Sequence, residues 1–286
     1  MGNHYIYRVG QFIVCYLPIQ WAYALAIVLA NIQCFISTTD RQAVASNLNA
    51  VLKRPATPQE IREVFQNFAR YMVDFLSMTK RVDHQFIKNN IVADGIEYLN
   101  DALAAGKGGI IVSAHLGNWE MGGAIFPLLG YPVAAVALTH QDPQVNIFFN
   151  AQREYFGCAV IQTNVAVRRV IEHLKMNKLV AILAERDFGQ HGVRMPFLNR
   201  TAMIPKGAAA FSIKTGAPII PCFFIRTEQQ ASFKIYFDKP IYPPKGNNDK
   251  LTDKELEVYI NQYLAVIERY ISAYPTQWLM FRDFTI

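Results

Sequence analysis

The stretch Gly109-Ile110-Ile111-Val112-Ser113-Ala114-His115-Leu116-Gly117-Asn118-Trp119-Glu120 contains the pattern that decides the fold. Residues 109–114 form a short apolar run rich in β-branched side chains, which is typical of a buried strand. Gly117 provides a turn after this strand, and we expect a helix to begin near Trp119. A buried strand followed directly by a turn and a helix is the unit from which parallel α/β sheets are built.

The same alternation of strands and helices continues along the chain. Short apolar runs predict strands at 131–138, 158–162, 179–184, 219–225 and 233–237, and longer segments predict helices at 143–156, 165–176, 208–215 and 253–274. A long loop is expected from 185 to 205, a length typical of functional loops. We therefore predict an α/β fold with a mostly parallel central sheet flanked by helices.

Residues 41–104, which precede this region, are predicted to be helical. Thr57-Pro58-Gln59-Glu60 offers an N-cap, a proline at the first helical position and a carboxylate in the first turn. Apolar residues then recur every three or four positions from Ile61 to Leu76. We expect residues 41–286 to form a single domain.

The first 40 residues are apolar, with no charged side chain between Arg8 and Asp40. The stretch is long enough to cross a bilayer, which takes about 20 apolar residues, although Pro18 interrupts it. We expect residues 1–40 to form a membrane-associated, apolar anchor helix. A spanning helix, a helix in the membrane plane and a buried core helix all fit the sequence. If the helix spans, the cations that follow it place the rest of the chain in the cytoplasm.

The composition limits the partners of the chain. Of its 286 residues, 52% are hydrophobic and 17% charged, with a net charge of +6. This balance fits an anionic membrane surface or an acidic ligand, whereas the dispersed basic residues do not indicate nucleic acid. The cysteines at 15, 34, 158 and 222 have neither redox nor metal-ligand spacing. We expect reduced thiols in the core and no metal site.

His115 is the first candidate for catalysis because it follows the buried strand directly. Open α/β sheets place their sites in the crevice at the carboxyl ends of the strands. A neutral imidazole takes a proton from a hydroxyl group near physiological pH, and a carboxylate on its other nitrogen, here Glu120, fixes the tautomer. The Gly117 turn must lie between the two if they are to touch. The spacing fits equally well a histidine that satisfies its hydrogen bonds in a turn.

Glu185-Arg186-Asp187 follows the strand predicted at 179–184 and so lies at another strand end. A carboxylate there is placed to support the histidine, and Arg186 suits bidentate binding of a phosphate or carboxylate. Further cations that suit phosphates or an acidic carrier are Arg153, Arg194, Arg200 and Lys206. A solvated salt bridge or an ordinary surface charge is the alternative for these residues.

Several common catalytic motifs do not occur in the sequence. These include the G-x-S-x-G nucleophile elbow, the Walker loop, H-E-x-x-H and the dinucleotide-binding G-x-G-x-x-G. No serine or cysteine stands in a recognisable nucleophile motif. The simplest group-transfer route is therefore direct attack by an acceptor hydroxyl that His115 activates.

The segment His115-Leu116-Gly117-Asn118-Trp119-Glu120 resembles the H-x4-[DE] motif of the lipid A late acyltransferase family, which includes the phosphatidylinositol-mannoside acyltransferases. The resemblance extends to Glu185-Arg186-Asp187, Pro196-Phe197-Leu198, the segment from Lys206 to Pro221, Asn47-Leu48 and the helix from Phe68 to Phe75. It covers most of the chain and is most specific in the histidine motif.

The resemblance implies a glycerolipid-acyltransferase-like fold and a bacterial enzyme on the cytoplasmic face of the inner membrane. It implies a membrane lipid or glycolipid as acceptor and acyl carrier protein or coenzyme A thioesters as donor, with no further cofactor. It also implies His115 as the base, Glu120 as its support, and the carboxylates near residue 185 in or beside the site.

Two departures from the family pattern leave the acceptor open. Glu185-Arg186-Asp187 replaces the Asp-Gln-Asp common in lipid A enzymes and is closer to the acid-Arg-Asp pattern of the mannoside branch. The segment from Trp278 to Arg282 only loosely resembles the family's basic aromatic ending. The alternatives are a glycerophosphate or lysophospholipid acyltransferase, which shares the histidine motif, and a catalytically silent lipid-binding protein.

Overall fold

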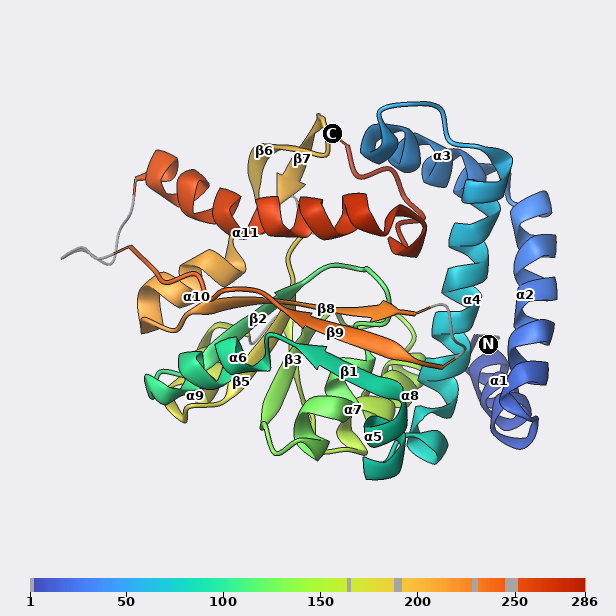
Figure 1. Ribbon diagram of the computed structural model, residues 1–286, viewed down its shortest axis with the longest axis horizontal. Helices are drawn as coiled ribbons and strands as arrows, with labels where there is room; N and C mark the ends of the chain where they lie inside the picture. The colour runs from blue at the N-terminus through green and yellow to red at the C-terminus, as the bar shows by residue number, and fades with distance from the viewer. Residues whose placement is uncertain (1–2, 164–165, 188–191, 228–230, 245–251, 286) are drawn as a thin grey trace.

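The computed structural model describes residues 3–163, 166–187, 192–227, 231–244 and 252–285 (Figure 1). Its centre is a seven-stranded sheet in the order β1-β9-β8-β2-β5-β3-β4. Neighbouring strands are parallel except β8 and β9, which are antiparallel, so the prediction of a mostly parallel sheet is confirmed. The strands are β1 (Ile91–Asp94), β2 (Gly109–Ser113), β3 (Val133–Ala137), β4 (Ala159–Gln162), β5 (Leu179–Leu183), β8 (Ile219–Arg226) and β9 (Phe233–Phe237).

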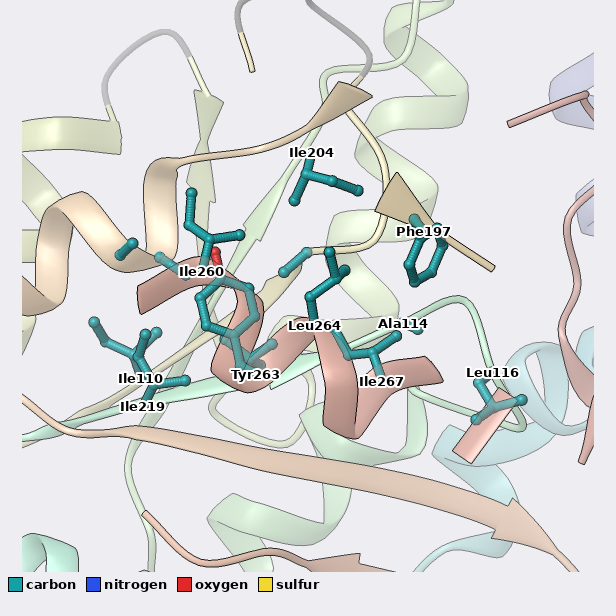
Figure 2. Packing of buried hydrophobic residues seen from close by; sticks show 14 of the residues in the cluster. Ile110, Ala114, Leu116, Phe197, Ile204, Ile219, Ile260, Tyr263, Leu264 and Ile267 are labelled. Atoms are coloured by element: carbon teal, nitrogen blue, oxygen red, sulfur yellow. The ribbon is translucent and has the colours of Figure 1, made fainter. Parts of the chain in front are cut away.

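Helices cover both faces of the sheet because successive side chains of a strand point to opposite faces. Ile110 and Val112 of β2 lie in one apolar core with α9, α10 and α11, whereas Ile111 lies in a second core with α6, α7 and α8. Figure 2 shows the first core, where Ile110 and Ile219 of the sheet lie beside Ile260 and Tyr263 of α11. These helices are α6 (Ile96–Ala104), α7 (Met121–Leu128), α8 (Pro143–Glu154), α9 (Ala166–Lys175), α10 (Gly207–Thr215) and α11 (Asp253–Ala273).

The helices that precede the sheet pack beside it. They are α1 (Asn3–Tyr16), α2 (Ile19–Ile36), α3 (Thr38–Leu52), α4 (Pro58–Arg81) and α5 (His84–Asn90). The predicted start of α4 is confirmed, since Thr57 and Glu60 form a capping box. Residues 3–36 form two helices where the sequence predicts one, because Pro18 interrupts them. Of these, α2 is long and apolar enough to cross a membrane by composition.

Two segments differ from the prediction. The edge strand β1 lies in the region expected to be helical, and its pairing with β9 is a tertiary contact that local periodicity does not contain. The loop expected at 185–205 contains the hairpin of β6 (Val193–Phe197) and β7 (Arg200–Ile204). Its turn places Leu198 and Asn199 at positive φ. Hairpin turns with positive φ usually carry glycine. Here the first turn position holds the buried Leu198, so the sequence contains no glycine that would mark the turn.

Candidate active site

The turn that carries His115 is fixed by the backbone on two sides. The amide of Asn118 donates to the carbonyl of Phe224 on β8 at 2.8 Å. Gly117 has a φ of 64°, and a Cβ there would collide with the same carbonyl oxygen, so the position requires glycine. From the other side, the amide of Gly117 donates to Gln277 O at 2.9 Å, and the amide of Leu279 donates to His115 O at 2.7 Å.

Glu185 is the carboxylate that contacts the His115 ring. Its Oε1 lies 2.6 Å from Nδ1 of His115 and accepts a second hydrogen bond from the His115 amide at 2.9 Å. The two residues meet because β2 and β5 are parallel neighbours in which Ser113 is paired with Leu183. The Glu185 side chain is fully buried, and that of His115 is 23% exposed.

The charge state of Glu185 follows from its surroundings. Burial acts to raise the pKa of Glu185, but the nearby His115 and the hydrogen bonds that it donates outweigh burial and hold this pKa below its ordinary value. An ionised carboxylate only accepts hydrogen bonds, so Nδ1 of His115 carries the proton and Nε2 is the basic nitrogen. This is the arrangement that a general base requires.

Glu120 forms an ion pair with Arg153. Arg153 donates from Nε to Oε2 at 2.8 Å and from Nη2 to Oε1 at 2.6 Å. Glu120 stands directly before α7 and Arg153 in the last turn of α8, and their side chains are only 9% and 11% exposed. Burial acts to lower the pKa of Arg153, but Glu120 outweighs it and raises this pKa.

These contacts revise two expectations from the sequence. The sequence predicts Glu120 as the carboxylate on the second nitrogen of His115, whereas Glu185 occupies Nδ1 and both oxygens of Glu120 bind Arg153. The reason is register, because neighbouring parallel strands align residues 70 positions apart. Arg153, expected as a cation that binds phosphates or an acidic carrier, is largely buried against Glu120. A role for Glu120 in the reaction stays a prediction.

Asn118 is hydrogen-bonded to a buried polar cluster that the sequence did not predict. Its Nδ2 donates to Oδ2 of Asp74 on α4 at 2.9 Å. Asp74 also accepts a hydrogen bond from the Tyr23 hydroxyl on α2 and forms an ion pair with Arg226 of β8. One signal was present in the sequence, since Asp74 is a single carboxylate among the apolar positions of a helix.

A chain of aromatic rings runs from His115 to the first helix. The His115 ring meets Trp119 at a centroid distance of 4.9 Å, and Trp119 stacks on Tyr71 at 4.6 Å. Tyr71 is followed by Phe75, which lies 4.8 Å from Phe149 on α8. Phe149 in turn contacts Tyr7 of α1 at 5.2 Å. The site is therefore connected through α4 and α8 to the N-terminal helices.

Arg186 and Asp187, which follow Glu185, contact the C-terminal segment and the β6–β7 hairpin. Arg186 Nη1 lies 3.3 Å from the sulfur of Met280. Burial and the neighbouring Arg282 lower the pKa of Arg186, so two cations stand close together beside Glu185. Asp187 accepts a hydrogen bond from the Gly192 amide, and its own amide donates to Met203 O at 3.1 Å. Asp187 thus ties the strand end to the β6–β7 hairpin.

The remaining predicted cations lie on or beside the hairpin. Arg194 is in β6 and exposed, and Lys206 is exposed at the start of α10. Arg200 in β7 donates to Ser46 Oγ at 2.8 Å and lies 4.0 Å from Asp283. In the described part of the chain, none of the three shares a hydrogen bond or an ion pair with His115 or Glu185.

In the described part of the chain, His115 belongs neither to a cluster of metal-ligating side chains nor to the lining of two surface hollows. Within the described ranges, no three His, Cys, Asp or Glu side chains come together in a way that would hold a metal ion. Surface hollows lie along the start of α4, lined by residues such as Arg62 and Arg70, and between α3 and Arg282. Neither of these two hollows is lined by His115.

A sequence profile described as bacterial lipid A biosynthesis acyltransferase matches residues 2–283. The chain belongs to this family. The resemblance inferred from the histidine motif is thereby confirmed.

Several curated acyltransferases are similar in sequence to part of this chain. A phosphatidylinositol mannoside acyltransferase of Mycolicibacterium smegmatis is 29% identical over 187 residues, covering 62% of this chain and 61% of the relative. A protein of the same name from Mycobacterium tuberculosis is 27% identical over 194 residues, covering 64% and 61%. A lipid A biosynthesis palmitoleoyltransferase of Escherichia coli is 22% identical over 186 residues, covering 62% and 60%. The chain thus spans 60–61% of the length of these relatives.

Proposed function

We propose that the protein transfers a fatty acyl group from a thioester donor to a hydroxyl of a membrane lipid or glycolipid, with His115 as general base. The observation that carries this proposal is the 2.6 Å contact between Nδ1 of His115 and the buried Glu185 carboxylate. A histidine oriented in this way at a strand end suits proton removal from an alcohol. Membership in a family of acyltransferases supports the same reaction.

The reaction converts the thioester of the donor into an oxygen ester of the acceptor in a single transfer, without an acyl-enzyme intermediate. Nε2 of His115 removes the proton of the acceptor hydroxyl while its oxygen attacks the thioester carbonyl carbon. A carbon–oxygen bond forms and the carbon–sulfur bond breaks, and the departing thiolate takes the proton from the imidazolium. Glu185 stabilises the imidazolium between these steps. The residues require neither a metal ion nor a cofactor other than the donor.

Glu120 and Arg153 have a positioning role in this proposal. The ion pair joins the start of α7 to the end of α8. Because the start of α7 follows the His115 turn, the pair holds that turn against α8. It also neutralises most of the Arg153 charge, so carrier binding falls to cations outside this pair.

The acceptor, the donor and the location are proposed from the resemblance to the family. Relatives named for phosphatidylinositol mannoside and for lipid A support a saccharide-containing lipid as the acceptor. The donor is acyl carrier protein or coenzyme A thioester, and the enzyme works on the cytoplasmic face of the bacterial inner membrane, where these donors are soluble. The net charge of +6 suits both the anionic donors and an anionic membrane surface.

The proposal is tested with purified full-length protein, a labelled palmitoyl thioester of each carrier, and a panel of acceptors. The panel contains a mannosylated phosphoinositide, a lipid A precursor, a lysophospholipid and glycerol 3-phosphate. We expect labelled product with a saccharide-containing lipid, and loss of product in His115→Ala. Transfer only to the lysophospholipid or glycerol phosphate would replace the acceptor class. Binding of labelled lipid without any transfer would indicate a silent lipid-binding protein.

A further inference from the structure

The outer face of α1 and α2, meaning the side turned away from α4, is apolar along both helices. Large hydrophobic side chains are exposed there at Tyr5, Ile6, Val9 and Phe12 of α1, and at Trp21, Leu25, Val28, Leu29, Ile32, Phe35 and Ile36 of α2. Exposed apolar surface of this extent on a folded domain marks an interaction site.

The inner face of the same helices is bonded to α4 along its length. Lys80 donates to Cys15 O at 2.6 Å, and Arg81 donates to Val14 O and Leu17 O at 2.9 and 2.8 Å, so α4 satisfies the carbonyls at the break between α1 and α2. Further along, the Tyr23 hydroxyl donates to Asp74, and Gln66 donates to Asn31 at 2.9 Å. Figure 1 shows α2 and α4 side by side over most of their lengths.

By composition, α2 could either cross a bilayer or lie in the membrane plane. Its attachment to α4 favours the second orientation. With 18 residues at about 1.5 Å each, α2 is about 27 Å long, close to the hydrocarbon thickness of about 30 Å. If α2 crossed the bilayer, α4 would have to lie at the same depth. However, α4 carries charged side chains along this length, among them Arg62, Arg70 and Asp74, and it also packs on α8. Charged side chains are strongly disfavoured at the bilayer centre.

We propose that the outer face of α1 and α2 docks onto one leaflet, with both helices lying in the membrane plane and neither crossing it. In this arrangement, the outer face of α1 and α2 contacts the lipids at the boundary between headgroups and acyl chains. Charge supports it, because no Asp or Glu occurs between residues 3 and 39, while Arg8 is exposed on α1. Tyrosine and tryptophan, which are exposed on both helices, favour this boundary.

The aromatic chain connects this face to the candidate active site. Tyr7 of α1 contacts Phe149, and the chain ends at Trp119 and His115. We expect docking of this face to bring a lipid substrate close to the elements that this aromatic chain connects to His115. This consequence rests on the proposed function, but the docking itself does not, because vesicle binding is measured without acyl transfer.

The first test compares matched variants of the full-length protein for co-sedimentation with vesicles of phosphatidylglycerol and phosphatidylethanolamine. Val28 of α2 and Val258 of α11 are both exposed on helices, at 54% and 60%. We expect Val28→Asp combined with Phe35→Asp to weaken vesicle binding by about tenfold or more. Val258→Asp combined with Ile147→Asp should leave vesicle binding unchanged. Circular dichroism melts of all variants control for folding.

The second test measures depth and separates an in-plane helix from a spanning one. Trp21, Val28 and Phe35 are spaced by seven residues and are all exposed, so single cysteines there sample one helix face. Nitroxide labels at the three positions should show the same shallow depth in vesicles. A middle label at the bilayer centre, with the outer labels at opposite interfaces, would overturn the proposal.

Two further outcomes would also overturn the docking proposal while sparing the proposed function. One is acyl transfer to detergent-dispersed lipid by a protein that does not bind vesicles. The other is a dimer in solution that Val28→Asp dissociates, which would make a second copy of the chain the occupant of the outer face. Conversely, vesicle binding at uniform shallow depth by a protein that transfers no acyl group would leave the docking intact and remove the proposed function.

Discussion

Oε1 of Glu185 accepts hydrogen bonds from both Nδ1 and the main-chain amide of His115, at 2.6 and 2.9 Å. One buried oxygen thus fixes the ring orientation and its tautomer together. We expect Glu185→Gln to lower kcat by about 10²–10⁴-fold, because an amide in this place offers no charge to the imidazolium. The check is steady-state kinetics with thermal unfolding as the folding control. Turnover within tenfold of wild type at unchanged stability would contradict the assigned role.

The same pair predicts a pH dependence of stability. The pKa of Glu185 in the folded protein is depressed, so the unfolded chain takes up this proton at a higher pH than the folded protein does. The stabilisation is fully present above the ordinary Glu pKa of about 4.3 and is lost as the pH falls through the lower folded value. The free energy of unfolding should fall in acid more steeply for wild type than for Glu185→Gln. Urea unfolding between about pH 6 and pH 3 measures this difference.

The exposed Glu257→Gln substitution on α11 controls for the loss of a carboxylate in general. It should reproduce the wild-type pH dependence. If wild type and Glu185→Gln showed parallel curves, the depressed pKa of Glu185 would be refuted.

A double-mutant cycle tests the ion pair of Glu120 and Arg153. Either Glu120→Gln or Arg153→Met leaves a buried charge without its partner, which costs about 3–5 kcal/mol of unfolding free energy. The double variant removes both charges and should cost less than the sum. The matched control is the exposed pair Arg168 and Glu172 on α9, at 89% and 47% exposure, where the measured coupling should not differ from zero because solvent screens both charges.

The cycle also separates structure from carrier binding. If Arg153→Met raised the KM for the donor without a loss of stability, Arg153 would act as a cation for the carrier and not as a positioning residue.

Removal of residues 1–36 should damage the fold as well as membrane binding. The sequence alone suggests that the segment is separable from the chemistry, but Ala22 and Tyr23 are each only 1% exposed in the interface with α4. Truncation exposes the apolar inner side of α4 and removes the Tyr23 hydrogen bond to Asp74. We expect a lower melting temperature and lower turnover on detergent-dispersed substrate.

The single variant Tyr23→Phe isolates the hydrogen bond in this interface. It should cost about 1.5–3 kcal/mol, because the acceptor is a buried carboxylate. A truncated protein with wild-type melting temperature would show that α1 and α2 are an independent unit.

The sequence was sufficient for most of the succession of strands and helices along the chain and for the position of His115 at a strand end. An apolar β-branched run followed by a glycine turn is a local signal, and a histidine at a strand end has a known place in a parallel sheet. The edge strand β1 and the β6–β7 hairpin were missed because pairing on the sheet and a buried Leu198 in a turn give no local signal.

The partners of the site residues were harder to predict, for a physical reason. The sequence offers two carboxylates to support His115, Glu120 five positions away and Glu185 at another strand end. The register of β2 and β5 is what brings Glu185 to the ring. Asp74 and Arg226 are 152 positions apart and meet beneath Asn118. Such contacts depend on how elements pack together, which spacing along the chain does not encode.

The backbone contacts of Gln277 and Leu279 with the His115 turn have a consequence for biosynthesis. Translation runs from the N-terminus, so the ribosome adds these residues after every other part of the turn and its partners. The His115 turn lacks two of its fixing hydrogen bonds until then, because these two bonds come from the segment of Gln277 and Leu279. In the nascent protein, both of these hydrogen bonds to the His115 turn can form only after residue 279 has been added.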